Sequence, residues 1–257
     1  MLKKEIQDNI VIAQLSDGAS NAVTIETLRL LKEIVDEVNE NDELKGIILT
    51  GEGRFFSSGF SLPMFVGFET PDQVIDFFEE EEKILVDYFT CKKPVVCAMN
   101  GHSAAMGLIL AMASDYRIVK NHPKIKIGMS EIKIGLALSI AQSAVVRFGL
   151  DSDKRYRDVM YFGDMVGVDK ALELEMVDEV VDGENLIARA KEIICLWIDT
   201  PNKPFIRIKQ ELKSAVAEKI RQDLANGDWK PPMADTLMSQ EVKDTLSFVQ
   251  SMMEQKK

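Results

Sequence analysis

The chain has 257 residues, and the 46% that are hydrophobic allow a sizeable core in one large domain or in one domain with an appendage. Its net charge of −11 and its pI near 4.8 argue against nucleic-acid binding, which needs clustered Lys and Arg to neutralise phosphates. The three cysteines and two histidines lack metal-ligand spacing, so we expect no metal site, and reduced thiols in a cytoplasmic protein.

The first part of the chain predicts strands and helices in alternation. Residues 1–8 lack the apolar core of a signal peptide, and residues 5–15 alternate loosely, which predicts one or two strands. Apolar residues recur at helical spacing over 24–39, so this segment is predicted to be an amphipathic helix. Residues 46–51 form a short apolar run between two glycines, which predicts a strand buried in a parallel-type sheet.

A Gly/Ser-rich turn over residues 53–62 follows this strand directly. Residues 63–92 then predict a long amphipathic helix, except at 63–71, where two prolines and a glycine predict a mobile flap. Four consecutive glutamates at 79–82 lie within the helix, and we interpret them as its solvated face.

The next stretch, residues 94–114, carries no charged residue. Its length is near that of a membrane span, but Pro94 opens it and Asn-Gly-His-Ser at 100–103 interrupts it, so neither half can cross a bilayer. It therefore predicts a buried strand over 95–99, a turn, and a helix over 105–114. A strand that leads into a helix directs free backbone N–H groups at one point, which suits a developing oxyanion. An ordinary buried corner of an α/β core explains the same residues equally well.

The remainder of the chain predicts short elements and then, after residue 182, helices only. Strands are expected over 116–119, 125–128 and 179–181, and helices over 140–148, 168–175, 184–199, 202–224 and 234–254. Strand–strand–helix units followed by a helical tail indicate an α/β spiral with a C-terminal helical appendage. We place the spiral core, with the active site, in residues 1–198 and a helical oligomerisation region in residues 199–257.

Three short segments are candidates for chemistry. The turns at 58–60 and 105–107 each follow an apolar strand and place a glycine where the backbone can approach a ligand closely. Glu131 follows a third strand in apolar surroundings, where burial would raise its pKa and make it a general base. Considered alone, Glu131 is more simply interpreted as a helix-capping or ion-paired residue, with Lys133 as its partner.

Taken together, these segments resemble the signature segments of the crotonase superfamily. Phe-Ser-Ser-Gly-Phe-Ser-Leu at 56–62, Asn-Gly-His-Ser-Ala-Ala-Met-Gly-Leu-Ile-Leu-Ala at 100–111 and Met-Ser-Glu-Ile-Lys-Ile-Gly-Leu at 129–136 occur in that superfamily's order and at similar separations. The similarity extends over residues 5–195, and the second and third segments most resemble 3-enoyl-CoA to 2-enoyl-CoA isomerases of the plant peroxisomal type. The resemblance implies a crotonase-like ββα spiral with a C-terminal helical trimerisation region, assembled as a homotrimer or hexamer.

The resemblance also implies an acyl-CoA substrate, with no cofactor apart from the coenzyme A that the substrate carries. It implies Glu131 as the single catalytic base that shifts the double bond, and the backbone N–H groups of Phe60 and Met106 as the oxyanion hole. Substrate-binding positions are implied at Ser58, Gly59, Ser61, Leu62, Ala105, Gly107 and Ile109.

The sequence departs from the superfamily pattern at three places: at Ile109, in the C-terminal segment, and at Ser61, where an aspartate is common. Hydratases of the superfamily use two glutamates, and the position of the second is occupied by Ile109, as fits the isomerases. Many members carry a basic cluster near the C-terminus that is absent from residues 248–254, so Lys256, Lys257 or Arg54 is expected to contact the coenzyme A phosphates, unless a carrier protein brings the acyl group. A hydratase, thioester hydrolase or decarboxylase reaction, or a non-catalytic acyl-CoA-binding subunit, stays an alternative.

Overall fold

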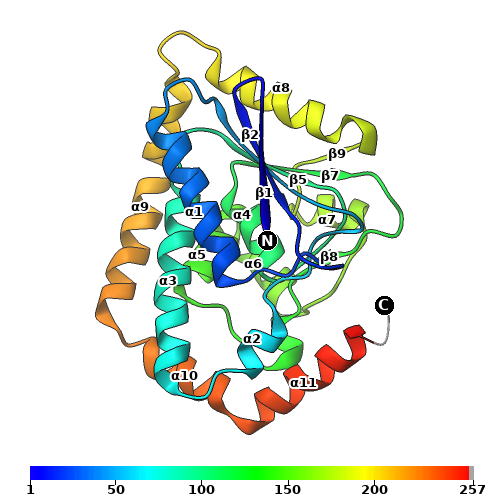
Figure 1. Cartoon of the computed structure of the whole chain (residues 1–257), viewed down its shortest axis with the longest axis vertical. Helices are drawn as coiled ribbons and strands as arrows, with labels where there is room; N and C mark the ends of the chain where they lie inside the picture. Colours follow the sequence, from blue (N-terminus) through cyan, green and yellow to red (C-terminus); the bar gives the residue numbers. More distant parts are fainter. Residues whose placement is uncertain (255–257) are drawn as a thin grey trace.

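The computed structural model describes residues 1–254 and contains two sheets (Figure 1). The larger sheet has six strands in the order β1-β2-β3-β5-β7-β9. Its strands are β1 (Leu2–Gln7), β2 (Ile10–Leu15), β3 (Gly46–Gly51), β5 (Val95–Met99), β7 (Tyr116–Lys120) and β9 (Glu179–Val181). Strands β1 and β2 pair antiparallel, and the other described neighbours in this sheet pair parallel.

The smaller sheet has three short parallel strands, β4 (Phe55–Ser57), β6 (His102–Ala104) and β8 (Ile127–Gly128). Each of them follows a strand of the larger sheet along the chain, and each is followed by one or more helices. The strand–strand–helix unit therefore repeats, which confirms the predicted α/β class and the ββα spiral. The repeat brings the carboxyl ends of β4, β6 and β8 to one edge, because parallel strands that pair run in the same direction.

Helices surround the two sheets. They are α1 (Ile25–Glu40), α2 (Leu62–Val66), α3 (Pro71–Phe89), α4 (Met106–Ala113), α5 (Ile140–Gly149), α6 (Asp153–Met160), α7 (Val168–Glu173), α8 (Leu186–Ile198), α9 (Pro204–Asn226), α10 (Lys230–Met238) and α11 (Gln240–Glu254), with 3₁₀ turns η1 (Glu131–Ile134) and η2 (Gly183–Asn185). Helix α1 begins where the Thr24 hydroxyl accepts a hydrogen bond from Thr27 N, as expected of an N-cap threonine. It lies alongside α3, and α3 in turn contacts α9 (Figure 1).

The central strands β2, β3 and β5 of the larger sheet bury both faces, as expected of strands that read as continuous apolar runs. Successive side chains point to opposite faces. Ile48 packs on the face covered by α8, whereas its neighbours Ile47 and Leu49 join the main core formed with α1, α3, α4 and α5. Because α8 closes the second face, Ile193 and Ile198 are buried within the chain.

Several boundaries differ from the sequence prediction. Strands β4 and β6 have three residues each and helix α6 has eight, so none of them shows a recognisable period in the sequence. The first two strands turn at Asp8 and Asn9, both with positive φ. The single helix expected over 234–254 is divided at Ser239 into α10 and α11. Helix α10 begins earlier than expected, at Lys230, because the two prolines occupy its first turn, where a missing N–H costs nothing.

The C-terminal part of the chain is anchored to the core by buried charges. Asp115, directly after α4, accepts hydrogen bonds from Lys209 Nζ (2.5 Å) and Lys213 Nζ (2.7 Å) of α9. Both ammonium groups also donate to carbonyl oxygens of the core, such as that of Phe89. Burial lowers the pKa of Lys213 to about 8, with Asp115 opposing that shift. Moving α9 away from the core would leave these buried charges without partners, which is energetically costly. The ion pairs therefore hold α9 in its position.

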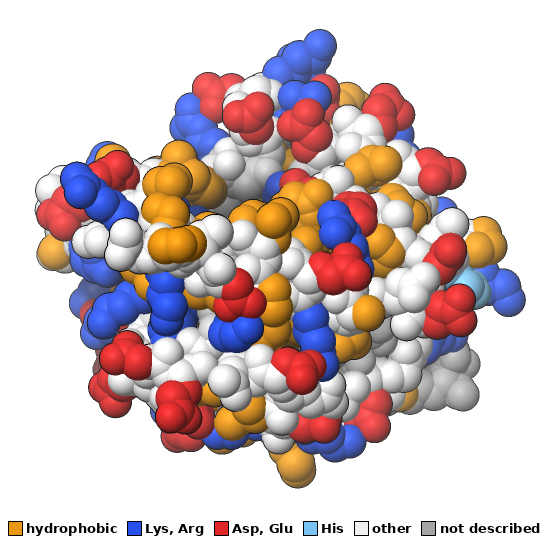
Figure 2. Space-filling view, turned by 90° about the horizontal axis from the view of Figure 1, so that it is seen from above, with side chains coloured by type: hydrophobic (Ala, Val, Ile, Leu, Met, Phe, Trp, Pro, Cys, Tyr) orange, Lys and Arg blue, Asp and Glu red, His pale blue; other side chains and the backbone are white. Residues whose placement is uncertain are grey.

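The surface mixes charge signs. On the face in Figure 2, Lys and Arg side chains alternate with Asp and Glu side chains, and apolar side chains are exposed between them. Within the described residues no helix is long and apolar enough to span a membrane. The uncharged stretch of residues 94–114 instead forms β5, β6 and α4, most of it within the core.

Candidate active site

The site lies where the three strands of the smaller sheet end. Strand β4 leads into Ser58-Gly59-Phe60, β6 into Ala105-Met106, and β8 into the segment that ends at Glu131. Strand pairing places these exits side by side, and Ala105 N donates to Gly128 O at 3.3 Å across β6 and β8. Segments that are far apart in the sequence are thus brought together by the fold.

The first two turns are packed directly against each other at Gly59. A Cβ atom on this glycine would lie 2.6 Å from Ala105 Cβ and 3.3 Å from Met106 N, so the backbones approach more closely than a side chain would permit. Gly59 also has φ of +97°, a conformation that favours glycine. Both the contact and the conformation require glycine here, which supports the prediction that this turn is built for close backbone approach.

The second turn holds a strained residue that directs the start of α4. Ala105 has φ of +50° and ψ of −128°, which costs a non-glycine residue about 1–3 kcal/mol and indicates that the surroundings impose the conformation. Met106 is then the first residue of α4, whose N-terminal N–H groups have no partner inside the helix. Among the described hydrogen bonds, neither Phe60 N nor Met106 N is used as a donor. Two free N–H groups on adjoining turns are suited to bind one oxyanion.

Two asparagines hold the first turn in place. The Asn21 amide donates to Glu52 O and Phe55 O at 2.9 and 2.8 Å, while its own carbonyl oxygen on the main chain accepts from Ser57 Oγ. Asn100 accepts from Gly51 N at 2.9 Å and donates to the loop before β4. Asn100 was predicted only as part of the turn at 100–103, and Asn21 was not predicted to have a role; the only signal for Asn21 is its position before a capped helix.

Glu131 begins the 3₁₀ turn η1 and is 8% exposed. Burial raises its pKa to about 7, opposed by a hydrogen bond from backbone N–H. Its Oε2 atom has no hydrogen-bond partner within the described residues, although buried polar atoms are usually paired. Lys133 pairs instead with Asp164 at 2.8 Å, so the simpler interpretation of Glu131 as an ion-paired residue is wrong. A carboxylate with this pKa can accept and return a proton near neutral pH.

An aromatic wall adjoins the oxyanion turn. The Phe60 ring lies 5.3 Å from that of Phe65 and 5.4 Å from that of Phe77, and Phe68 and Phe78 extend the same cluster. Helices α10 and α11 cover this cluster within the same chain. The wall is therefore apolar, as a hydrocarbon acyl chain would need.

The predicted flap has more structure than its sequence suggested. Pro63 lies in the first turn of α2 and Pro71 begins α3, positions where proline is well tolerated. Phe65 and Phe68 are buried against α10 and α11, and Lys243 Nζ donates to Phe68 O at 2.7 Å. The expectation of irregular structure over 63–71 was thus wrong for α2, while its response to ligand stays a prediction.

The other predicted binding positions lie around the same turns. Ser58 and Ser61 are half-buried, Leu62 begins α2, and Gly107 packs against Ser57, where an added Cβ would come within 2.7 Å of the serine Cβ. Ile109, one turn into α4, is 1% exposed and belongs to the main core. The site consequently has no carboxylate at the Ile109 position.

One prediction about the surroundings was wrong. Glu79 and Glu80 are on the surface, paired with Lys230 and Arg29, but Glu81 and Glu82 have no exposed area at all. The helix rotates by 100° per residue, so a run of four glutamates cannot lie on one solvated face of a helix packed on several sides. Sequence analysis assigned the whole run to solvent because glutamates are rarely buried without a partner.

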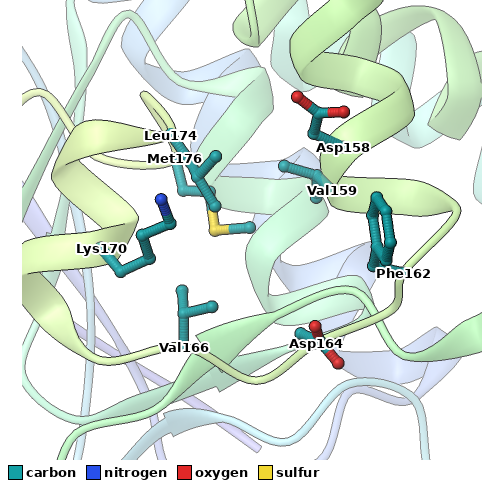
Figure 3. Close-up of a pocket in the computed structure, with 8 residues that line it drawn as sticks. All are labelled: Asp158, Val159, Phe162, Asp164, Val166, Lys170, Leu174 and Met176. Carbon is teal, nitrogen blue, oxygen red and sulfur yellow. The ribbon is translucent and has the colours of Figure 1, made fainter.

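A separate pocket of about 250 Å³ lies between α6, α7 and the segment that bridges to β8. Val166, which bridges to Ile127 of β8, lines it together with side chains from α6 and α7 (Figure 3). Lys170 faces this pocket but is paired with Glu173 at 2.6 Å. None of the described residues of the turns at 58–60, 105–107 or 129–131 is among the residues that line this pocket.

Comparison with known proteins identifies the family of the chain. Residues 5–249 match the enoyl-CoA hydratase/isomerase family. The chain belongs to this family. Among curated relatives, enoyl-CoA delta isomerase 1 of mouse mitochondria is 23% identical over 223 residues, which cover 86% of this chain and 76% of the relative. The peroxisomal enoyl-CoA delta isomerase 1 of Arabidopsis thaliana is 26% identical over 180 residues, 69% of this chain and 74% of the relative.

Solved structures of the family share the fold. The human mitochondrial delta3-delta2-enoyl-CoA isomerase superposes with a TM-score of 0.91 at 18% identity, over 100% of this chain and 99% of that one. A probable enoyl-CoA hydratase from Mycobacterium tuberculosis superposes with a TM-score of 0.80 at 23% identity, over 92% and 98% of the two chains. Proteins named for two different reactions thus share this crotonase fold, so the reaction has to be argued from the site.

Proposed function

We propose that this protein is an enoyl-CoA isomerase that moves the double bond of a 3-enoyl-CoA into conjugation, giving the 2-enoyl-CoA. The observation that carries the proposal is the adjacency of three strand exits: β4 and β6 lead to the free N–H groups of Phe60 and Met106, and β8 leads to the buried carboxyl group of Glu131. Ile109 leaves the second carboxylate position of the hydratases apolar. Curated relatives named enoyl-CoA delta isomerase support the same reaction.

The site's groups each have a role in this reaction. The thioester oxygen accepts hydrogen bonds from Phe60 N and Met106 N, which strengthen as negative charge develops on it. The Glu131 carboxylate removes a proton from the α carbon, and the electrons of that C–H bond form a dienolate. The glutamic acid then returns the proton to the γ carbon, so the double bond moves to the α and β carbons. One carboxylate suffices because it reaches both carbons on one face of the substrate.

The apolar wall favours isomerisation over hydration. Hydration requires a positioned water molecule, which two carboxylates hold in the superfamily's hydratases, whereas Ile109 offers no hydrogen bond. The dienolate next to Phe60, Phe65 and Phe77 is also shielded from bulk solvent, which limits loss of the transferred proton to water. The proposed reaction uses only the thioester of the substrate, the Glu131 carboxylate and the two backbone N–H groups.

The binding of coenzyme A is part of the same proposal. Lys256 and Lys257 lie outside the described residues, so they carry no structural argument. Arg54 is exposed, has no acidic partner among the described residues, and lies 3.4 Å from His102 Nε2. Burial, followed by the charges of Arg54 and the neighbouring bases, lowers the pKa of His102. We assign Arg54 to the phosphates of coenzyme A.

Substitution of the base tests the assignment. Glu131→Gln keeps the size of the side chain but removes its proton affinity, so conversion of trans-3-hexenoyl-CoA should fall by about 10²–10⁴-fold. Binding of saturated hexanoyl-CoA, measured by calorimetry, should change little, because Phe60 and Met106 contribute backbone groups only. The absorbance of the conjugated thioester reports the reaction.

Two results would overturn the assignment. Full isomerase activity in Glu131→Gln would show that another group is the base. Efficient hydration of crotonyl-CoA by the unmodified protein would show that the reaction is that of a hydratase. Tight acyl-CoA binding with no turnover of either thioester would instead indicate a non-catalytic binding subunit.

A further inference from the structure

The main core contains two adjacent carboxyl groups that the reaction does not use. Glu81 and Glu82 of α3 are both fully buried, and neither has a cationic partner among the described residues. Glu82 Oε2 accepts a hydrogen bond from Ala141 N at 2.7 Å, and Glu81 Oε1 accepts from Gln142 Nε2 at 3.2 Å. Both glutamates therefore contact the first turn of α5, whose N–H groups attract negative charge.

This first turn is connected to the catalytic carboxyl group by a short, hydrogen-bonded segment. Gln142 Oε1 accepts from Ser139 N at 3.3 Å, so the residue that precedes α5 is held by the same glutamine that contacts Glu81. At the other end of the segment, Leu136 N donates to Glu131 O at 3.0 Å. A displacement of the start of α5 would thus be transmitted to Glu131 over eight residues.

We propose that Glu81 and Glu82 are positioning residues, which fix the start of α5 and thereby place Glu131 against the oxyanion turns. Glu82 acts as the acceptor for the helix N-terminus, and Glu81 acts as a carboxylic acid that orients Gln142. The proposal rests on the proposed isomerase function for its kinetic consequences, while its structural part can be measured without substrate.

The surroundings of the pair favour the protonated form of Glu81. Burial, followed by the charge of Glu82, raises the pKa of Glu81 well above its ordinary value, and burial raises the pKa of Glu82 to about 7. Among the described residues, neither Glu81 nor Glu82 has an ion-pair partner: Arg147 of α5 pairs with Asp153, and Lys83 of α3 itself is exposed. Arg29 and Lys32 of α1 pair with Glu80, Asp36 and Asp87, Lys230 of α10 pairs with Glu79, Lys213 of α9 pairs with Asp115, and α4 has no charged residue.

A consequence follows for alkaline solution. When both carboxyl groups lose their protons, two negative charges meet in the core with only the N-terminus of α5 to offset them. The start of α5 should then loosen, and Glu131 should lose its position. The activity of the unmodified enzyme should accordingly rise with pH as Glu131 ionises and fall again at higher pH as the pair ionises fully.

Three variants test the proposal through the pH profile of isomerisation. Glu81→Gln keeps an acceptor for Gln142 but cannot ionise, so it should abolish the alkaline fall of kcat and leave the acidic limb unchanged. Glu82→Leu removes the acceptor for Ala141 N and should lower kcat by about 10- to 100-fold, with KM changed less than threefold. Glu80→Gln, at the adjacent exposed position, is the matched control and should keep the profile of the unmodified enzyme.

Hydrogen exchange of the start of α5 provides the readout without substrate. The amides of Ala141 and Gln142 should exchange at least tenfold faster in Glu82→Leu, and should lose protection above neutral pH in the unmodified protein but not in Glu81→Gln. If Glu82→Leu does not fold, the Glu81→Gln profile decides. An alkaline limb unchanged in Glu81→Gln, or unchanged α5 exchange in a folded Glu82→Leu, overturns the proposal. If exchange changes as expected but the unmodified protein has no isomerase activity, the proposed isomerase function is wrong, and the structural role of the two glutamates stands.

Discussion

At the scale of single residues, the candidate site depends on residues with unfavourable backbone conformation, unusually close packing or a buried ionisable group. Gly59 occupies a turn where any Cβ would clash, Ala105 adopts a positive φ, and Glu131 is a carboxyl group held in an apolar setting. Each of these three features costs stability. Such features are typical of functional sites, here one in which two N–H groups and one base are proposed to act together. The surrounding core therefore has to impose positions that the local sequence disfavours.

The pKa of Glu131 predicts how its substitution affects stability. Its folded-state pKa of about 7 exceeds the ordinary value of 4.5, so the unfolded chain ionises first and folding stability declines as pH rises through this interval. The glutamine of Glu131→Gln cannot ionise. Its free energy of unfolding, relative to the unmodified protein, should therefore be higher at pH 8 than at pH 5 by about 3 kcal/mol, at about 1.4 kcal/mol per pKa unit.

Urea unfolding of both proteins at pH 5 and pH 8 measures this difference. Glu80→Gln serves as the control, because Glu80 is exposed and paired with Arg29. Equal differences in unfolding free energy at the two pH values would show that Glu131 has an ordinary pKa, and its role as a base poised near neutral pH would then lose its support.

At the scale of secondary-structure elements, helices that are distant in the sequence enclose the phenylalanine cluster next to Phe60. Helix α2, which follows the oxyanion turn, packs against α11, and α3 packs against α10. Phenylalanine rings from α2 and α3 fill the space between them. Any acyl chain that enters next to Phe60 has to displace or rearrange this cluster, so α2 and α11 are expected to respond together to substrate.

Hydrogen exchange tests this lid. Residues 62–72 should exchange more slowly with saturating hexanoyl-CoA than without ligand, because the acyl chain adds apolar contacts to Phe65 and Phe68. Helix α11 should gain protection with them, while α1, whose buried face belongs to the main core, serves as an internal control. If exchange over 62–72 is the same with and without ligand, this segment is not a lid.

At the scale of the whole molecule, the division into a spiral core at residues 1–198 and an oligomerisation region from residue 199 is a proposal about assembly. Many apolar side chains of the C-terminal helices, such as Leu237 on α10, are buried against other parts of the same chain. Other large apolar side chains are well exposed: Leu196 on α8, Ile208 and Leu212 on α9, and Phe248 on α11. Exposed apolar surface of this kind favours association between copies.

Analytical ultracentrifugation, which measures the oligomeric state, tests this prediction. The protein should behave as a trimer or hexamer at micromolar concentration, and the double substitution Ile208→Lys with Leu212→Lys should shift it toward monomer. Ser214→Lys, exposed on another side of α9, is the matched control and should keep the assembly. A single monomeric species of the unmodified protein would contradict the predicted oligomer.

The sequence by itself determined the elements whose pattern is local. Helix α1, strand β3, strand β5 and helix α4 were predicted within one or two residues, because their apolar periods and flanking glycines or caps are read directly from neighbouring residues. The two glycine turns and Glu131 were also identified, since a strand exit beside a glycine or an isolated carboxylate is a local signal. Strands β4 and β6 were missed, because three residues carry no period.

Only the tertiary structure decided which of these segments meet and which glutamates are buried. The pairing of β4, β6 and β8 brings the two turns and Glu131 to one edge of the smaller sheet. In the sequence, the turns at 58–60 and 105–107 are more than 40 positions apart, and Glu131 follows the second turn by more than 20. Glu81 and Glu82 look like their exposed neighbours in sequence, and only the packing of α3 against the start of α5 removes them from water. The physical reason is that burial and pairing depend on distant elements, whereas periodicity depends on adjacent residues.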